Sequence, residues 1–209
     1  MTGVTNRETP ALMLIEEFTH RVLNEYSRAI AGLRLAARAI DDDHARHGLS
    51  EAADRLYAQA HAHRALAMPV GATRHDVADY IANVCSAIAN ALSSETELRL
   101  ELKASEAMLS ADQCWLLALI VSELIHNAAR HGRQGGEILV ELSALHGQLL
   151  CQVSNASDCS TPPRPGRGRR VVTALARELD GRANWLFAPT AARAWVVVPL
   201  EIGSLAADQ

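Results

Sequence analysis

The chain has 209 residues, 49% of them hydrophobic and 21% charged, which is enough for one mid-sized globular domain or two small ones. Its formal net charge of -4 provides no overall basic field, so we expect no nucleic-acid partner. The longest apolar run, residues 115–121, is too short to span a bilayer, and we expect no membrane insertion. The four cysteines form no CxxC pair and no signal segment opens the chain, so we expect a cytoplasmic protein with reduced thiols.

Residues 1–10 are polar and end in a proline, which predicts a flexible leader. After it, apolar residues recur in steps of three and four, the pattern of a long amphipathic helix. We expect this helix to bury the stripe formed by Ile15, Phe18, Val22, Tyr26, Ala29, Leu33, Ala36 and Ile40.

A second helix is predicted to follow, with Gly48 and Ser50 marking the turn and the cap before it. The two helices predict a hairpin over residues 11–68. A single hairpin cannot bury an apolar stripe on both of its helices. We therefore expect a homodimer through residues 11–68, closed as a four-helix bundle.

Beyond a linker at residues 68–73 the pattern changes to helices mixed with short strands. Helices grouped with a largely antiparallel sheet predict an α+β fold, a two-layer α/β sandwich over residues 74–202, with a tail at 203–209. A capping box at Ser110–Gln113 is expected to open the central helix. The other elements are predicted as helices over 77–92 and 171–179 and as strands over 98–102, 138–142, 149–153, 185–187 and 195–200.

Glu123, Asn127 and His131 follow one another at intervals of four residues at the end of the central helix. This spacing places a carboxylate, a carboxamide and an imidazole on one helical face. They could hold a metal-bound polyphosphate. The simpler interpretation of the spacing alone is a polar stripe that faces solvent.

His20 lies off the predicted apolar stripe of the first helix and is expected to face water. Glu17 and Asn24 lie on the same exposed face, close enough to orient the imidazole or an incoming phosphate. An ordinary surface histidine is the alternative interpretation of this spacing.

Gly166 and Gly168 open the helix predicted at residues 171–179. A glycine-rich turn at a helix N-terminus presents backbone N–H groups to a phosphate, although a solvated surface loop has the same composition. The arginines that would add positive charge are Arg164, Arg167, Arg169 and Arg170.

Two of these motifs resemble those of a known family. Residues 123–132, Glu-Leu-Ile-His-Asn-Ala-Ala-Arg-His-Gly, resemble the N box of the GHKL ATP-binding fold. Residues 18–24, Phe-Thr-His-Arg-Val-Leu-Asn, resemble the phosphoacceptor box of HisKA_2 and HWE-type sensor histidine kinases.

The resemblance implies that Asn127 holds Mg²⁺ on the phosphates of ATP and that Glu123 polarises the attacking group. It also implies that His20, aided by Asn24, accepts the γ-phosphoryl group and passes it to an aspartate on the receiver domain of a response regulator. A sensor protein acting in trans is a possible further partner. The nucleotide site would further contain His131, Asn155, Gly166, Gly168, Arg167 and Arg169, with the glycines and arginines in a G2-type box and ATP lid.

Two alternatives stay open. Residues 155–159 lack the Asp-x-Gly-x-Gly turn usual at the adenine site, although the carbonyl of Asn155 can still accept a hydrogen bond. Loss of that turn also fits a histidine phosphotransfer protein that relays phosphate between response regulators through His20 and binds no ATP. Another alternative is a non-catalytic adaptor that only docks a regulator on the helical bundle. His131 could equally complement the C-terminus of its helix.

Overall fold

A computed structural model describes residues 10–93, 99–133, 135–157 and 166–200. The predicted tail at 203–209 and residues 1–9 of the predicted leader lie outside the described residues. The chain divides into two compact units, Met1–Ala67 and Met68–Gln209, and each is described by itself. Within the described ranges, no helix combines the length and the apolar character needed to cross a membrane.

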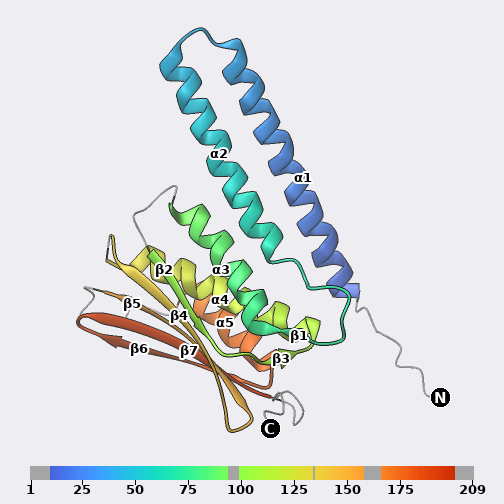
Figure 1. The fold of residues 1–209 in the computed structure, drawn as a ribbon, viewed down its shortest axis with the longest axis vertical. Helices are drawn as coiled ribbons and strands as arrows, with labels where there is room; N and C mark the ends of the chain where they lie inside the picture. Colours follow the sequence, from blue (N-terminus) through green and yellow to red (C-terminus); the bar gives the residue numbers. More distant parts are fainter. Residues whose placement is uncertain (1–9, 94–98, 134, 158–165, 201–209) are drawn as a thin grey trace, which may run out of the picture. The chain divides into compact units, whose positions relative to one another are not determined.

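The first unit is a helical hairpin formed by α1, Pro10–Ala39, and α2, Asp43–Ala65 (Figure 1). The predicted turn at Gly48 and Ser50 is wrong, because both residues lie inside α2. The helix begins earlier, where the Asp42 side chain accepts a hydrogen bond of 2.8 Å from the backbone N–H of Ala45. An aspartate cap satisfies an N–H group that would otherwise have no partner, and one glycine inside a helix costs only about 1 kcal/mol.

The buried stripe of α1 includes Tyr26 and Leu33, as predicted, but differs from the prediction at two positions. Ile30 and Ala37 are buried, whereas the predicted Ala29 and Ala36 are exposed. Burying isoleucine removes far more apolar surface from water than burying alanine, which favours Ile30 over Ala29 at the core. The hairpin core consists of Ile30, Ala53 and Ala60, with Leu23, Tyr26, Leu33 and Leu56 packed against it.

The second unit is a two-layer α/β sandwich, as predicted. Its main sheet has the strand order β2-β4-β5-β7-β6, and only the β2–β4 pair is parallel. A small antiparallel pair, β1 with β3, was not predicted. The strands are β1 His75–Asp76, β2 Arg99–Ala104, β3 Met108–Leu109, β4 Glu137–Leu145, β5 Gln148–Ala156, β6 Arg182–Ala188 and β7 Ala191–Pro199; the helices are α3 Val77–Ser93, α4 Ala111–His131 and α5 Arg167–Glu178.

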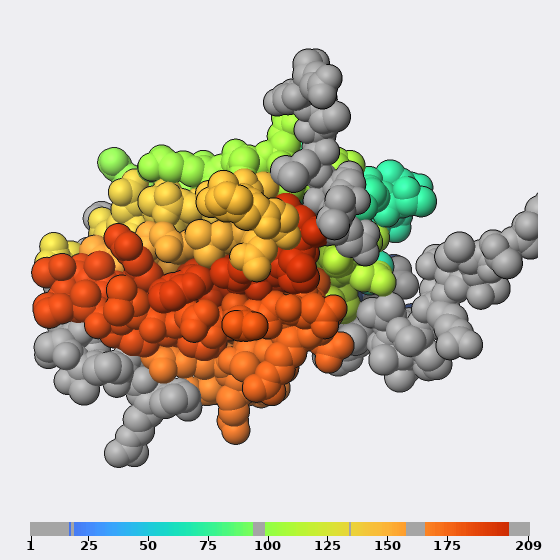
Figure 2. Space-filling model, turned by 90° about the horizontal axis from the view of Figure 1, so that it is seen from below, coloured from blue at the N-terminus to red at the C-terminus, as the bar shows by residue number. Residues whose placement is uncertain are grey.

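The helices α3, α4 and α5 cover one face of the main sheet (Figure 1). Alternate residues of β4, namely Ile138, Val140 and Leu142, are fully buried, whereas their neighbours are not. This alternation is the pattern of a strand with one face on a core. Figure 2 shows the opposite face, where bands of colour follow the strand order from green β2 through yellow and gold to red β7 and orange β6.

Helix α4 forms the centre of the unit, and its N-terminus confirms the predicted capping box. The Ser110 hydroxyl accepts a hydrogen bond from the Gln113 backbone N–H, and the Gln113 side chain accepts one from the Ser110 backbone N–H. Helix α5 begins at Arg167, with Gly166 as its N-cap, earlier than predicted. Gly168, Arg169 and Arg170 therefore lie in the first turn of a helix and not in a loop before it.

Candidate nucleotide site

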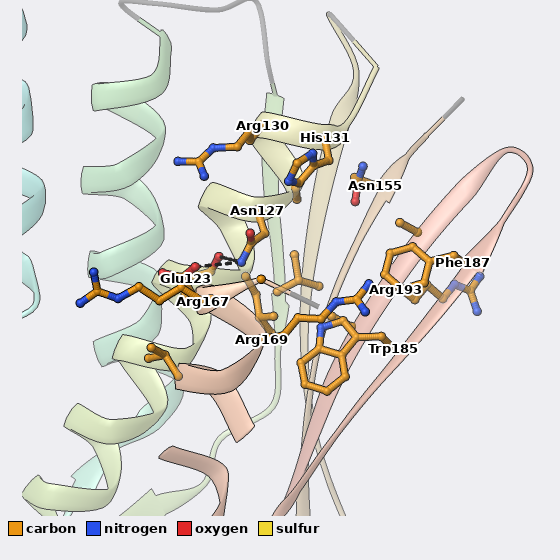
Figure 3. A pocket seen from close by; sticks show the side chains of 18 residues that line it. Glu123, Asn127, Arg130, His131, Asn155, Arg167, Arg169, Trp185, Phe187 and Arg193 are labelled. Atoms are coloured by element: carbon orange, nitrogen blue, oxygen red, sulfur yellow. Dashed lines mark hydrogen bonds between the residues drawn. The ribbon is translucent and has the colours of Figure 1, made fainter. Parts of the chain in front are cut away.

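Glu123 and Asn127 form a hydrogen-bonded pair at the half-buried edge of α4. The Asn127 Nδ2 atom donates to the Glu123 carboxylate Oε1 at 3.0 Å and to the Glu123 backbone carbonyl at 2.7 Å (Figure 3). Because the amide nitrogen is used in this way, the Asn127 Oδ1 atom points away from Glu123. It is the atom of this pair that is best placed to bind a cation.

The first turn of α5 packs directly on this pair. A Cβ atom at Gly168 would overlap Glu123 Oε1 and would lie 2.9 Å from Asn127 Nδ2. Glycine therefore allows the α5 backbone to approach the carboxylate more closely than any other residue would. Gly168, which was predicted to face phosphate, therefore also packs against Glu123, the predicted acidic residue.

A cavity of about 580 Å³ opens beside this pair, between α4, α5 and the inner face of the sheet (Figure 3). Its size suits a small ligand. All of the residues predicted for the nucleotide site contribute to its wall: Glu123, Asn127, His131, Asn155, Gly166, Arg167, Gly168 and Arg169. Arg170 does not line the cavity, and Arg164 lies outside the described residues.

Asn155 lies in the cavity wall near the end of β5. Its Nδ2 atom donates a 2.9 Å hydrogen bond to the Ala156 carbonyl, which leaves Oδ1 as the acceptor for a ligand. The same carbonyl accepts the Arg133 backbone N–H at 3.0 Å, so the end of β5 is tied to the end of α4. Gly132 lies within this junction, where a Cβ would come 2.5 Å from the Ala128 carbonyl and 2.9 Å from Asn155 Nδ2.

The predicted phosphoacceptor lies in the first unit. His20 is exposed on α1, and its Nδ1 atom lies 3.2 Å from Asn24 Nδ2. Glu17, which was expected to orient the imidazole, instead accepts a 2.7 Å hydrogen bond from Arg21. This bond and the charge of Arg21 lower the pKa of Glu17. Asn24 is thus the neighbour that contacts the ring directly.

Sequence reasoning missed ten residues of the cavity wall, four of them charged or aromatic. Arg130 of α4 adds positive charge and Trp185 and Phe187 of β6 add aromatic rings, whereas the side chain of Arg193 lies on the other face of β7 and points away from the cavity (Figure 3). Trp185 and Phe187 are two residues apart on β6, so both rings lie on the inner face of the sheet. Their partners on β7 are small, because Trp185 pairs with Ala194 and Phe187 with Ala192. The alternation was visible in the sequence, but the pairing that turns both rings toward the cavity depends on distant residues.

The charge around the cavity is predominantly positive. Arg130, Arg167 and Arg169 line it together with one carboxylate, that of Glu123. Guanidinium groups bind phosphate oxygens with two parallel hydrogen bonds and remain charged at any physiological pH. The cavity therefore suits a ligand that carries several negative charges.

Comparison with known proteins agrees with this geometry. A family model described as HisKA_2, histidine kinase, matches residues 17–92. Over 119 residues the chain is 33% identical to the sensor histidine kinase PdtaS of Mycolicibacterium smegmatis. The match spans 56% of this chain and 23% of that relative, so the chain corresponds to less than a quarter of its length.

Two solved structures share the fold. The histidine kinase domain of the blue-light activated histidine kinase EL346 from Erythrobacter litoralis has a TM-score of 0.57 and 21% sequence identity; the match covers 85% of this chain and 96% of that one. A bacterial phosphotransferase has a TM-score of 0.59 and 11% identity, over 85% of this chain and 91% of that one. Residues 17–92 thus match a histidine kinase family model, part of the chain is similar in sequence to a sensor histidine kinase, and the fold is that of the two solved structures.

Proposed function

We propose that this chain is a kinase core that uses Mg-ATP to phosphorylate His20 and passes the phosphoryl group to an aspartate of a response regulator. The observation that carries the proposal is the hydrogen-bonded pair of Glu123 and Asn127 in the wall of a cavity lined by arginines. This pair offers a carboxylate as a base beside an amide oxygen that suits a hard cation.

The residues of the cavity fit Mg-ATP. Asn127 Oδ1 would bind Mg²⁺, because the Nδ2 atom of the same amide is held by Glu123. Mg²⁺ would neutralise charge on the phosphates and orient them for transfer. Arg130 and Arg167 would bind phosphate oxygens, and Asn155 Oδ1 would accept a hydrogen bond from the adenine amino group.

In the first step an imidazole nitrogen of His20 attacks the γ-phosphorus, the N–P bond forms and the P–O bond to ADP breaks. Asn24 contacts Nδ1, so Nε2 is the ring nitrogen without this contact and the one that we assign as nucleophile. Glu123 accepts the proton that the imidazole loses. The N–P bond then breaks as an aspartate oxygen of the receiver domain takes the phosphoryl group.

Residues 11–68 would provide the dimer interface. The hairpin leaves Leu35 of α1 64% exposed and Tyr57 of α2 55% exposed. Burying such side chains against a second hairpin would supply favourable apolar contact.

The decisive test is calorimetric titration of the purified chain with Mg-AMPPNP, in parallel with the Asn127→Ala variant. We expect saturable binding that the substitution weakens at least about tenfold, because it removes the cation ligand. Incubation with γ-labelled ATP should then label the wild type and not His20→Ala. Labelling that survives in His20→Ala would contradict the assignment of the phosphoacceptor.

A histidine phosphotransfer protein without ATP binding is the second candidate. Two observations favour it: residues 155–159 contain no glycine, and the fold is similar to that of a bacterial phosphotransferase. In that case Mg-AMPPNP would not bind, and His20 would be labelled only by a phosphorylated receiver domain. A variant His20→Ala that still supports phosphoryl flow between regulators would contradict both candidates and favour the adaptor.

A further inference from the structure

Arg169 differs from the other arginines of the cavity because aromatic rings hold its side chain. Its Cζ atom lies 4.5 Å from the centre of the Phe187 ring and 5.7 Å from the centre of the Trp185 ring. The β7 residues paired with these aromatics are alanines, which leave room for a guanidinium on the same face of the sheet. Attraction between a cation and aromatic faces fixes the group at this position.

One side of this guanidinium has no partner. The Nη2 atom of Arg169 is buried and makes no hydrogen bond to any described residue. None of the ion pairs between described residues includes Arg169. Partial burial lowers the pKa of its guanidinium, because burial disfavours the charged form. Aromatic faces interact with the plane of a guanidinium, whereas its N–H bonds lie within the plane and require acceptors. A desolvated donor in a ligand cavity therefore points to an acceptor on the ligand.

The alternative role for Trp185 and Phe187 would be to stack against the nucleotide base. Stacking on the ring faces next to Arg169 would require the space that its guanidinium occupies. The base would have to displace a cation from two favourable contacts. The geometry instead favours rings that act on the ligand through Arg169.

We propose that Arg169 is a fixed phosphate-binding group of the nucleotide site, and that Trp185 and Phe187 are positioning residues that hold its guanidinium toward the phosphates. This inference rests on the proposed binding of ATP. It assigns the aromatic rings to the phosphate end of the ligand and not to the base.

The first experiment measures how the chain binds two probes, Mg-AMPPNP and magnesium tripolyphosphate, by calorimetry. Arg169→Met keeps the length of the side chain and removes its charge, and we expect it to weaken both probes at least about tenfold, because a charge-assisted hydrogen bond is lost. Arg170→Met is the matched control. It removes the same charge from the next residue, which is exposed and outside the cavity wall, and should change either affinity less than about twofold.

The second experiment separates positioning from base stacking with a double-mutant cycle. Phe187→Leu alone should weaken the binding of both probes. In the Arg169→Met background it should have almost no further effect on either affinity. If the ring stacks on the base, Phe187→Leu would weaken Mg-AMPPNP but not tripolyphosphate, and the two substitutions would be additive. That result would overturn the inference. Circular dichroism and thermal unfolding of each variant check that the fold is retained.

The two probes also separate this inference from the proposed function. If tripolyphosphate binds in an Arg169-dependent manner and Mg-AMPPNP does not bind, the cavity is a phosphate site and the kinase proposal fails. If Mg-AMPPNP binds with equal affinity to the wild type and to Arg169→Met, the kinase proposal stands and the role of Arg169 is wrong. If neither probe binds to the wild type, both proposals are wrong.

Discussion

Gly168 of α5 lies against the carboxylate of Glu123 on α4, so closely that a Cβ atom would overlap Glu123 Oε1. The carboxylate also accepts a hydrogen bond from Asn127, and these two contacts together fix its position. Two motifs that are 45 residues apart in the sequence thus meet at one oxygen atom. The contact explains why a glycine is needed within the first turn of a helix, where it is otherwise unfavourable.

Gly168→Ala should separate catalysis from stability. The new methyl group would push the Glu123 carboxylate aside, because the end of a glutamate side chain moves more easily than a helix backbone. We expect the initial rate of His20 phosphorylation to fall at least about tenfold, since the carboxylate leaves the position of the base. The temperature of unfolding should not fall, because alanine is favoured over glycine inside a helix by about 1 kcal/mol.

Gly48→Ala is the matched control for this substitution. Gly48 also lies inside a helix, and a Cβ there would meet no other atom within 4 Å. It should raise the stability of the hairpin slightly and leave the rate of phosphorylation within about twofold. Equal rates for Gly168→Ala and the wild type would show that the contact with Glu123 has no role in catalysis.

Gly132→Ala should destabilise the unit Met68–Gln209. A Cβ there would lie 2.5 Å from the Ala128 carbonyl, an atom of the helix backbone that has little freedom to move, and 2.9 Å from Asn155 Nδ2. We expect a loss of about 1–3 kcal/mol in the free energy of unfolding, the usual range for overpacking. Urea unfolding followed by tryptophan fluorescence measures it, because all three tryptophans lie in this unit. An unchanged unfolding midpoint would contradict the geometry of this junction.

Local signals in the sequence were sufficient where short-range contacts decide the structure. Ser110 and Gln113 predicted the start of α4 because a capping box is completed within four residues. The polar face of Glu123 and Asn127 was likewise fixed by helical spacing. Gly48 was misleading because two interpretations were locally possible, and the side chain of Asp42 provided the stronger cap for α2.

Other features depend on contacts between distant segments and could not be read from spacing. The inward direction of Trp185 and Phe187 follows from the pairing of β6 with β7, and their contact with Arg169 follows from the position of α5. The burial of Ile30 in place of Ala29 depends on how α2 packs against α1. In each case the sequence predicted the element but not the side chain that the neighbouring element would cover.

Asn155→Leu should change the preference for the nucleotide base. The Nδ2 atom of Asn155 is held by the Ala156 carbonyl, so Oδ1 is left as an acceptor, which under the proposed function takes the hydrogen bond of the adenine amino group. The wild type should therefore prefer ATP over inosine triphosphate, which lacks that amino group, by about fivefold or more. Asn155→Leu should lose this preference while retaining affinity for tripolyphosphate. Competition titrations measure both, and a preference that persists in the variant would exclude Asn155 from base recognition.

The buried thiols predict a pH dependence of stability. Burial raises the pKa of Cys85 to about 12 and that of Cys114 to about 11, and it also raises the pKa of Cys151. Below a pH of about 7.5 these thiols are almost entirely neutral in both the folded and the unfolded chain, so they contribute almost no pH dependence. Between about pH 8 and pH 11 the unfolded chain loses these protons while the folded chain largely keeps them, and the free energy of unfolding should fall. Urea unfolding at pH 7.5 and pH 10 measures the change, and Cys85→Ala, which removes one of the thiols, should reduce the fall.

In a Cys159→Ser variant at pH 8, a thiol reagent should label the remaining cysteines only after unfolding. Rapid labelling of the folded protein would contradict the burial of these thiols.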